Sequence, residues 1–182
     1  MMDKIKFINF ICDLLAIDNP DIYFFKDCQL TSIDGHPVDK FFRIKKEAAA
    51  TSYPEENTII INLDVVKDDF IYVVLAHEIR HIYQYHTILN PYWEEPMAKT
   101  WEKETSNYSA SDVPGYENQN IEIDAIAFSK IIFNFIFKKD FDANCDQKKL
   151  QNRINELLQE FSLEEIIDSY EYTIGVFNKD QS

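Results

Sequence analysis

Apolar residues recur at helical spacing along much of this chain. Near its start they return every three or four residues, which predicts an amphipathic helix over about residues 3–17, ended by Asp18-Asn19-Pro20. Between Asp69 and Leu89 no Gly or Pro occurs, and apolar residues lie on more than one side of the predicted helix. We therefore expect a central, mostly buried helix there, with Asp64 or Asp68 as its N-terminal cap.

The C-terminal half of the chain is also predicted to be helical. A strongly apolar helix is expected over about residues 117–138, followed by amphipathic helices near 147–161 and 163–177. Ser162 and Glu165 have the spacing of a capping box at the start of the last helix.

Residues 91–115 contain three Pro and both Trp of the chain, Trp93 and Trp101. Such a long connection can line or cover a substrate cleft. The alternative, which we favour for the Trp residues, is a short helix near residues 94–104 whose indoles pack on the core.

Between the first two helices the pattern is typical of strands. Short aromatic or β-branched runs occupy residues 22–25, 41–44 and 58–63, with turn-forming residues between them. Residues 47–52 and 58–63 are predicted to form a hairpin. We expect a small, mainly antiparallel sheet packed on the central helix, in an α+β fold.

The length is that of one domain, which we expect to span residues 1–182. Its core is predicted at about residues 21–138, with helices 3–17 and 147–177 as scaffold.

Hydrophobic residues make up 46% of the chain, which is too apolar for a disordered protein, and no apolar run is long enough for a membrane span. The three cysteines are scattered, which favours reduced thiols and a soluble, cytoplasmic protein.

The charge excludes some partners. With 18 basic and 32 acidic residues the formal net charge is −14 and the pI is about 4.6. Such a surface repels phosphate backbones and anionic lipids, so we expect neither nucleic acid nor membrane as a partner.

The predicted central helix carries the motif H-E-x-x-H, with His77, Glu78 and His81. Residues four apart lie on one helical face, so both imidazoles can reach one metal ion while Glu78 lies beside them. The alternative is a buried helix whose two histidines happen to be stacked.

A third metal ligand is expected on the helix predicted at residues 117–138, where Glu122 and Asp124 lie among apolar residues. Two positions apart on a helix, they point about 200° away from each other, so one metal cannot take both. Glu122 shares its face with the small residues Ala125 and Ser129, which allows close approach of the central helix. We therefore favour Glu122 as the ligand, and Asp124 as an acceptor behind a ligand histidine or a surface charge.

A strand ending in Asn, then Ala-His-Glu-Ile-x-His, then about forty residues later Glu-x-x-Ala-x-x-Phe-Ser, resembles the ImmA/IrrE-type metallopeptidases. More broadly the chain is similar to the gluzincin zinc peptidases. The resemblance implies a zincin-like fold, zinc held by His77, His81 and Glu122, and Glu78 as general base. It also implies a protein substrate, often the repressor of a phage or mobile element. Arg80 stands where that family usually has Gly or Ala.

Three functions remain open on the sequence. The leading hypothesis is a zinc-dependent endopeptidase acting on a protein or peptide. The second is a non-catalytic, zinc-stabilised regulatory or partner-binding domain, and the third is a metal-free protein with a coincidental motif. A peptidase also needs a group that stabilises the oxyanion, for which Tyr108, Tyr116 and Arg80 are candidates.

Overall fold

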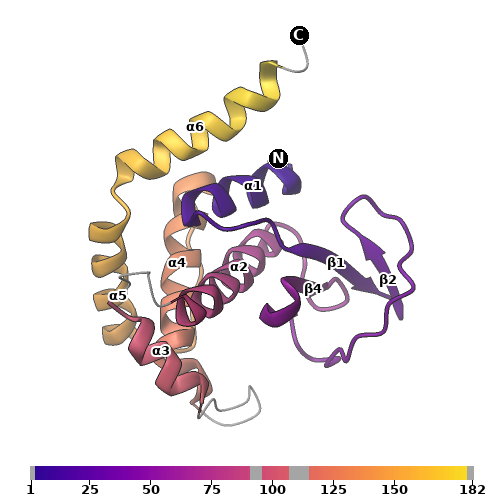
Figure 1. Cartoon of the computed structure of the whole chain (residues 1–182), viewed down its shortest axis with the longest axis horizontal. Coiled ribbons are helices and arrows are strands. Elements are labelled where there is room, and N and C mark those ends of the chain that lie inside the picture. Colours follow the sequence, from indigo (N-terminus) through magenta and orange to yellow (C-terminus); the bar gives the residue numbers. More distant parts are fainter. Residues whose placement is uncertain (1–2, 91–95, 107–114, 180–182) are drawn as a thin grey trace.

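A four-stranded mixed sheet and six α-helices make up the part of the chain that the computed structural model describes, residues 3–90, 96–106 and 115–179. The sheet lies on one side of the long helix α2, and α4 lies on the other side (Figure 1). The strands are β1 (Asp21–Lys26), β2 (Gln29–Ser32), β3 (Ala50–Tyr53) and β4 (Thr58–Asn62). The helices are α1 (Lys4–Leu15), α2 (Phe70–Leu89), α3 (Ala98–Thr105), α4 (Asn120–Phe137), α5 (Gln147–Glu160) and α6 (Leu163–Lys179), and Pro54–Glu56 and Tyr116–Asn118 form single 3₁₀ turns.

The strand order in the sheet is β2-β1-β4-β3. Strands β3 and β4 form the predicted antiparallel hairpin, with Ser52 opposite Ile59. Strand β1 is antiparallel to β2 but parallel to β4, so the sheet is mixed rather than simply antiparallel. This arrangement leaves β3 at one edge of the sheet, next to α2.

One strand was missed and one predicted strand is wrong. Strand β2 follows β1 through the two-residue turn Asp27-Cys28, where both residues have positive φ (49° and 63°). A two-residue turn with positive φ usually contains Asn-Gly. Because Asp27-Cys28 lacks this signature, the sequence did not indicate a hairpin here. Residues 41–44 form no strand, and Phe42 instead packs its ring against Tyr23 and Tyr53.

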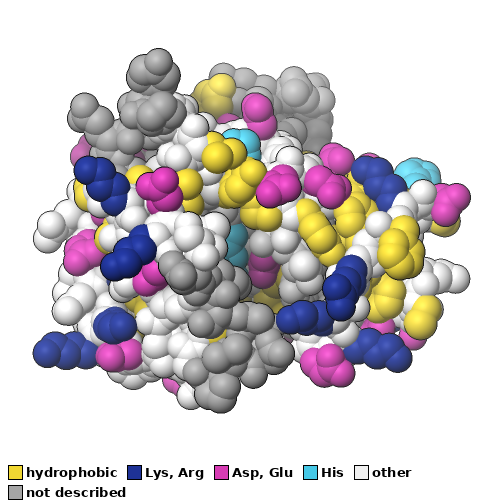
Figure 2. Space-filling view, turned by 60° about the horizontal axis from the view of Figure 1, so that its bottom comes forward, with side chains coloured by type: hydrophobic (Ala, Val, Ile, Leu, Met, Phe, Trp, Pro, Cys, Tyr) yellow, Lys and Arg dark blue, Asp and Glu magenta, His cyan; other side chains and the backbone are white. Residues whose placement is uncertain are grey.

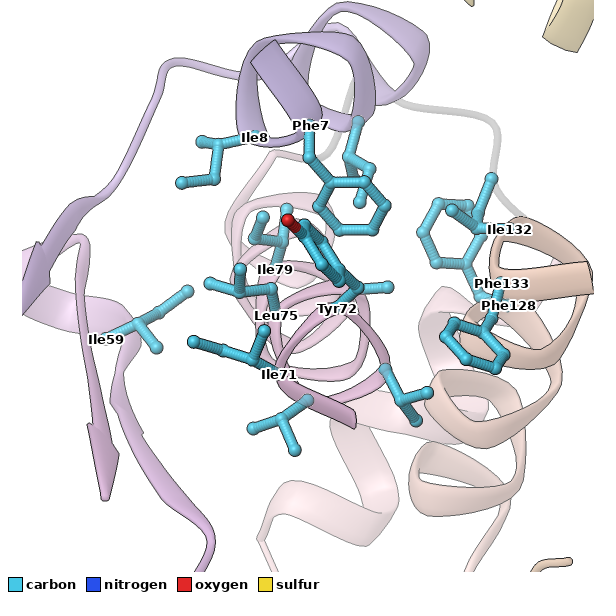
Figure 3. Close-up of a cluster of buried hydrophobic side chains, with 14 of the residues drawn as sticks. Phe7, Ile8, Ile59, Ile71, Tyr72, Leu75, Ile79, Phe128, Ile132 and Phe133 are labelled. Carbon is cyan, nitrogen blue, oxygen red and sulfur yellow. The ribbon is translucent and has the colours of Figure 1, made fainter. Parts of the chain in front are cut away.

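The hydrophobic core lies where α1, α2, α4 and one face of the sheet meet (Figure 3). Helix α1 contributes Phe7, which packs edge-on against Tyr72 of α2, with ring centroids 4.9 Å apart. Ile59 points from β4 toward α2, and Phe128 points from α4 toward the same centre. Helix α2 therefore has apolar neighbours on several sides, as its sequence predicts. Packing against α1, α4 and the sheet fixes its position in the fold.

The start of α2 differs from the prediction. Asp69 occupies the cap position without a side-chain hydrogen bond to the helix, and Asp68 has a positive φ of 49°. The Asp64 carboxylate instead accepts from the backbone N–H of Asp27, 3.2 Å away. The predicted cap was therefore wrong, because neither Asp64 nor Asp68 caps α2.

The remaining helices follow the sequence closely. The capping box of α6 is present, since the Ser162 hydroxyl accepts from the Glu165 N–H and the Glu165 carboxylate accepts from the Ser162 N–H. Trp101 of α3 is fully buried, as expected for core packing, whereas Trp93 lies outside the described residues. Cys12, Cys28 and Cys145 are free thiols.

No helix in the described ranges has both the length and the apolar character that crossing a membrane requires.

Candidate metal centre

Two imidazoles from α2 and one carboxylate from α4 meet where these helices pack against each other. His77 and His81 lie one turn apart on α2, and Glu122 lies in the first turn of α4. Ala125 and Ser129, which follow Glu122 at helical spacing, are both buried. Their small side chains allow the close contact between the helices, as the sequence suggested.

The donor atoms of these three residues converge on one point. The Nε2 atoms of His77 and His81 are 3.0 Å apart. The Glu122 carboxylate lies 3.4 Å from His77 Nε2 and 3.6 Å from His81 Nε2. Among the His, Cys, Asp and Glu side chains of the described residues, this is the one group that could hold a metal ion. All of its donor atoms lie within 4.8 Å of one another.

These distances fit a tetrahedral zinc site. Ligand atoms about 2.0–2.2 Å from a zinc ion at tetrahedral angles lie roughly 3.4 Å from one another. The observed separations of 3.0, 3.4 and 3.6 Å bracket that value. The ring-to-carboxylate distances are also longer than good N–H···O hydrogen bonds. The three donors therefore have the chemistry and the spacing of a His₂Glu centre.

The charges of the cluster are strongly coupled. Burial favours the neutral imidazole of His81, but the adjacent Glu122 outweighs it and raises the pKa of His81 to about 9. Burial likewise opposes ionisation of Glu122, yet His81 and His77 lower the pKa of its carboxyl far below the usual range. At neutral pH the metal-free cluster therefore holds a proton, which a cation must displace, so metal affinity falls as the pH drops below about 9.

A cleft of about 1130 Å³ opens beside the cluster. Its walls include Thr51 on β3, Glu78 on α2 and Tyr116 before α4, together with the three donors. Figure 2 looks onto this face, where histidine (cyan) and acidic (magenta) side chains lie in a hollow near the centre of the view. Glu78, the predicted general base, is thus on the same wall as His77 and His81.

Asp124 is turned away from the donors. It is fully buried, and its carboxylate accepts from Arg80 Nε at 2.8 Å and from Arg153 Nε at 2.7 Å. The structure therefore brings Glu122, and not Asp124, to the two histidines. Asp124 is no surface charge either, because two arginines from α2 and α5 hold it in the interior.

The structure places two of the three candidates for oxyanion stabilisation, Arg80 and Tyr116. Arg80 was a wrong candidate: it is fully buried, pairs with Asp124, and packs against the rings of Tyr83 and Phe128. Tyr116 lines the cleft, and burial, followed by the negative charge of Glu122, raises the pKa of its hydroxyl, so it stays protonated. Tyr108 lies outside the described residues.

Sequence reasoning missed the residues that support the cluster from behind. Gln84 is fully buried on α2, and its Oε1 lies 2.7 Å from His81 Nδ1. Arg80 and Arg153 surround Asp124. Asp124 had been considered as an acceptor behind a ligand histidine, but its pairing with Arg80 was not predicted. A usable signal was present, because each is a charged residue flanked by apolar residues on its helix and a buried charge needs a partner. Gln84 carries no such signal.

Comparison of this chain with protein-family models, with curated proteins and with solved structures found no match.

Proposed function

We propose that this protein is a zinc-dependent endopeptidase with a zincin-like fold, of the kind that the resemblance to the ImmA/IrrE-type peptidases implies. One observation carries the proposal: the donor atoms of His77, His81 and Glu122 lie 3.0 to 3.6 Å from one another, close enough to share one metal ion, and Glu78 lines the cleft beside them. A purely structural zinc site is normally closed by four protein ligands, whereas three ligands beside a cleft leave one position for water or substrate.

The cleft suits an extended peptide. Strand β3 is an edge strand and contributes Ala50, Thr51 and Ser52 to the cleft wall. The outer edge of such a strand offers backbone N–H and C=O groups, with which a peptide can pair as an added strand. A substrate bound in this way would pass in front of α2, which carries Glu78 and both histidines.

Glu78 acts as the general base in this proposal. Its carboxylate accepts a proton from the attacking water and delivers it to the leaving amine, so that no free amide anion forms. When bound, zinc supplies Lewis acidity, which acidifies water and polarises the scissile carbonyl. His77, His81 and Glu122 hold that charge at a fixed place next to Glu78 and so orient the reaction.

Tyr116 is the group that we assign to the oxyanion. Its hydroxyl stays protonated because burial and the nearby Glu122, Glu117 and Glu78 oppose its ionisation by raising its pKa. A neutral O–H at the cleft wall can donate a hydrogen bond to the developing negative oxygen of the tetrahedral intermediate.

Digestion of a randomised peptide library, read by mass spectrometry, tests the proposal. We expect the zinc-loaded full chain to cleave internal peptide bonds, to lose this activity with 1,10-phenanthroline, and to regain it with added zinc. Zinc binding without cleavage of any peptide would contradict the proposal and favour a non-catalytic, zinc-stabilised domain.

Replacement of Tyr116 by Phe is expected to lower kcat by about 100- to 1000-fold, the usual cost of losing one oxyanion donor, with little change in KM or zinc content. The measurement is steady-state hydrolysis of a peptide found in the library. Tyr23→Phe is the matched control, because the Tyr23 hydroxyl bonds to Asp21 and Lys40 rather than lining the cleft. Equal losses in both variants would remove Tyr116 from the mechanism.

A further inference from the structure

The side chain of Gln84 connects the metal centre to a buried charge network. Gln84 lies three residues after His81 on α2 and is fully buried. Its Oε1 is 2.7 Å from His81 Nδ1. Its Nε2 donates to Asp124 Oδ2 at 2.7 Å and to the backbone carbonyl of Ile121 at 2.9 Å. Every polar atom of this amide therefore has a defined partner.

These partners fix which way the amide points. The Asp124 carboxylate and the Ile121 carbonyl only accept hydrogen bonds, so the NH₂ group of Gln84 must face them. A flipped amide would set its oxygen against two other oxygens and leave buried groups unpaired. The oxygen of Gln84 must consequently face His81, and His81 Nδ1 must be the donor in that contact.

Asp124 is itself held rigidly. Arg80 of α2 donates to it through Nε and Nη2, at 2.8 and 3.1 Å, and Arg153 of α5 donates through Nε at 2.7 Å. Arg153 is anchored in turn by Glu160, 2.7 Å away. Side chains from two helices, α2 and α5, thus fix the Asp124 carboxylate of α4, which orients Gln84.

We propose that Gln84 is a positioning residue for the metal centre. Through its oxygen it holds the proton of His81 on Nδ1 and the plane of the ring, so that the Nε2 lone pair faces His77 and Glu122. Asp124 contributes by setting the direction of the Gln84 amide. This inference rests on the metal centre of the proposed function and deepens it by naming the group that prepares His81 for binding.

The test compares wild type with Gln84→Met, which keeps the approximate length and volume of the side chain but replaces the amide oxygen with a thioether sulfur, a much weaker hydrogen-bond acceptor. Competition with a chromogenic chelator measures the zinc affinity of the full chain. We expect Gln84→Met to lower it by about 10- to 100-fold, the usual cost of losing a hydrogen-bond partner behind a ligand. The control is Thr87→Val on the same helix, where the buried hydroxyl has no hydrogen-bond partner among the described residues. We expect Thr87→Val to match wild type.

A spectroscopic readout separates positioning from general stability. In ¹H–¹⁵N correlation spectra of the zinc-loaded wild type, we expect His81 to be ligated through Nε2, with a slowly exchanging proton on Nδ1. In Gln84→Met that proton should exchange quickly with water. Should Gln84→Met fail to fold, the wild-type spectrum still decides, because ligation through Nδ1 would overturn the inference.

The outcomes also separate this inference from the proposed function. Absence of zinc binding by wild type would overturn both. Tight binding by wild type, with equal affinity in Gln84→Met, would overturn only the role of Gln84 and leave the metal centre in place.

Discussion

Replacement of Glu122 by Gln is expected to lower zinc affinity by at least about 100-fold. Loss of a residue that only hydrogen-bonds to a ligand typically costs less, about 10- to 100-fold. The substitution keeps the size of the side chain but removes its negative charge and a strong donor oxygen. Two neutral imidazoles then remain at the centre, and two ligands hold zinc far more weakly than three. Chelator competition on the purified variant measures the change.

Glu117→Gln is the matched control for Glu122→Gln, because Glu117 lines the same cleft but does not belong to the donor cluster. An unchanged affinity in Glu122→Gln, or an equal loss in Glu117→Gln, would show that Glu122 is not a ligand. Asp124→Ala is unsuitable for this comparison. It would leave the buried Arg80 without its carboxylate partner, a defect that typically costs about 3–5 kcal/mol of folding free energy, whereas Arg153 would keep Glu160.

Replacement of Glu78 by Gln is expected to abolish peptide hydrolysis while zinc content and fold are kept. The amide has the same shape as the carboxylate but cannot take a proton from water, and loss of a general base typically costs about 100- to 10,000-fold in rate. Glu78 lies on the cleft wall and outside the donor cluster, so the metal should remain bound. Peptide hydrolysis and elemental analysis of the same preparation measure both effects.

Glu47→Gln removes a carboxylate from another part of the same cleft and should change the rate little. Near wild-type turnover by Glu78→Gln would refute the proposed chemistry. Loss of zinc from Glu78→Gln would instead mean that Glu78 supports the metal centre directly.

Local patterns in the sequence predicted the helices, the β3–β4 hairpin and the capping box of α6. Each of these features depends on residues that are close together in the chain. In the capping box, for example, Ser162 and Glu165 are three positions apart. The parallel pairing of β1 with β4 joins strands far apart in sequence, and no local pattern encodes it. The β1–β2 hairpin was missed for a different reason, because Asp27 and Cys28 adopt positive φ without the usual glycine.

The candidate site was predictable in its first layer only. The H-E-x-x-H spacing and an acid on an apolar helix are enough to identify His77, His81 and Glu122 as a possible cluster. The group behind them depends on which side chains meet across α2, α4 and α5. Arg80 is an example, because its guanidinium forms the buried pair with Asp124 and packs among aromatic rings.

The most direct test of the central claim is diffraction from crystals of the zinc-loaded protein, recorded above and below the zinc absorption edge. The account predicts one anomalous peak bounded by Nε2 of His77, Nε2 of His81 and the carboxylate of Glu122. Zinc that binds only elsewhere, or crystals grown with zinc that show no peak between these three residues, would contradict it.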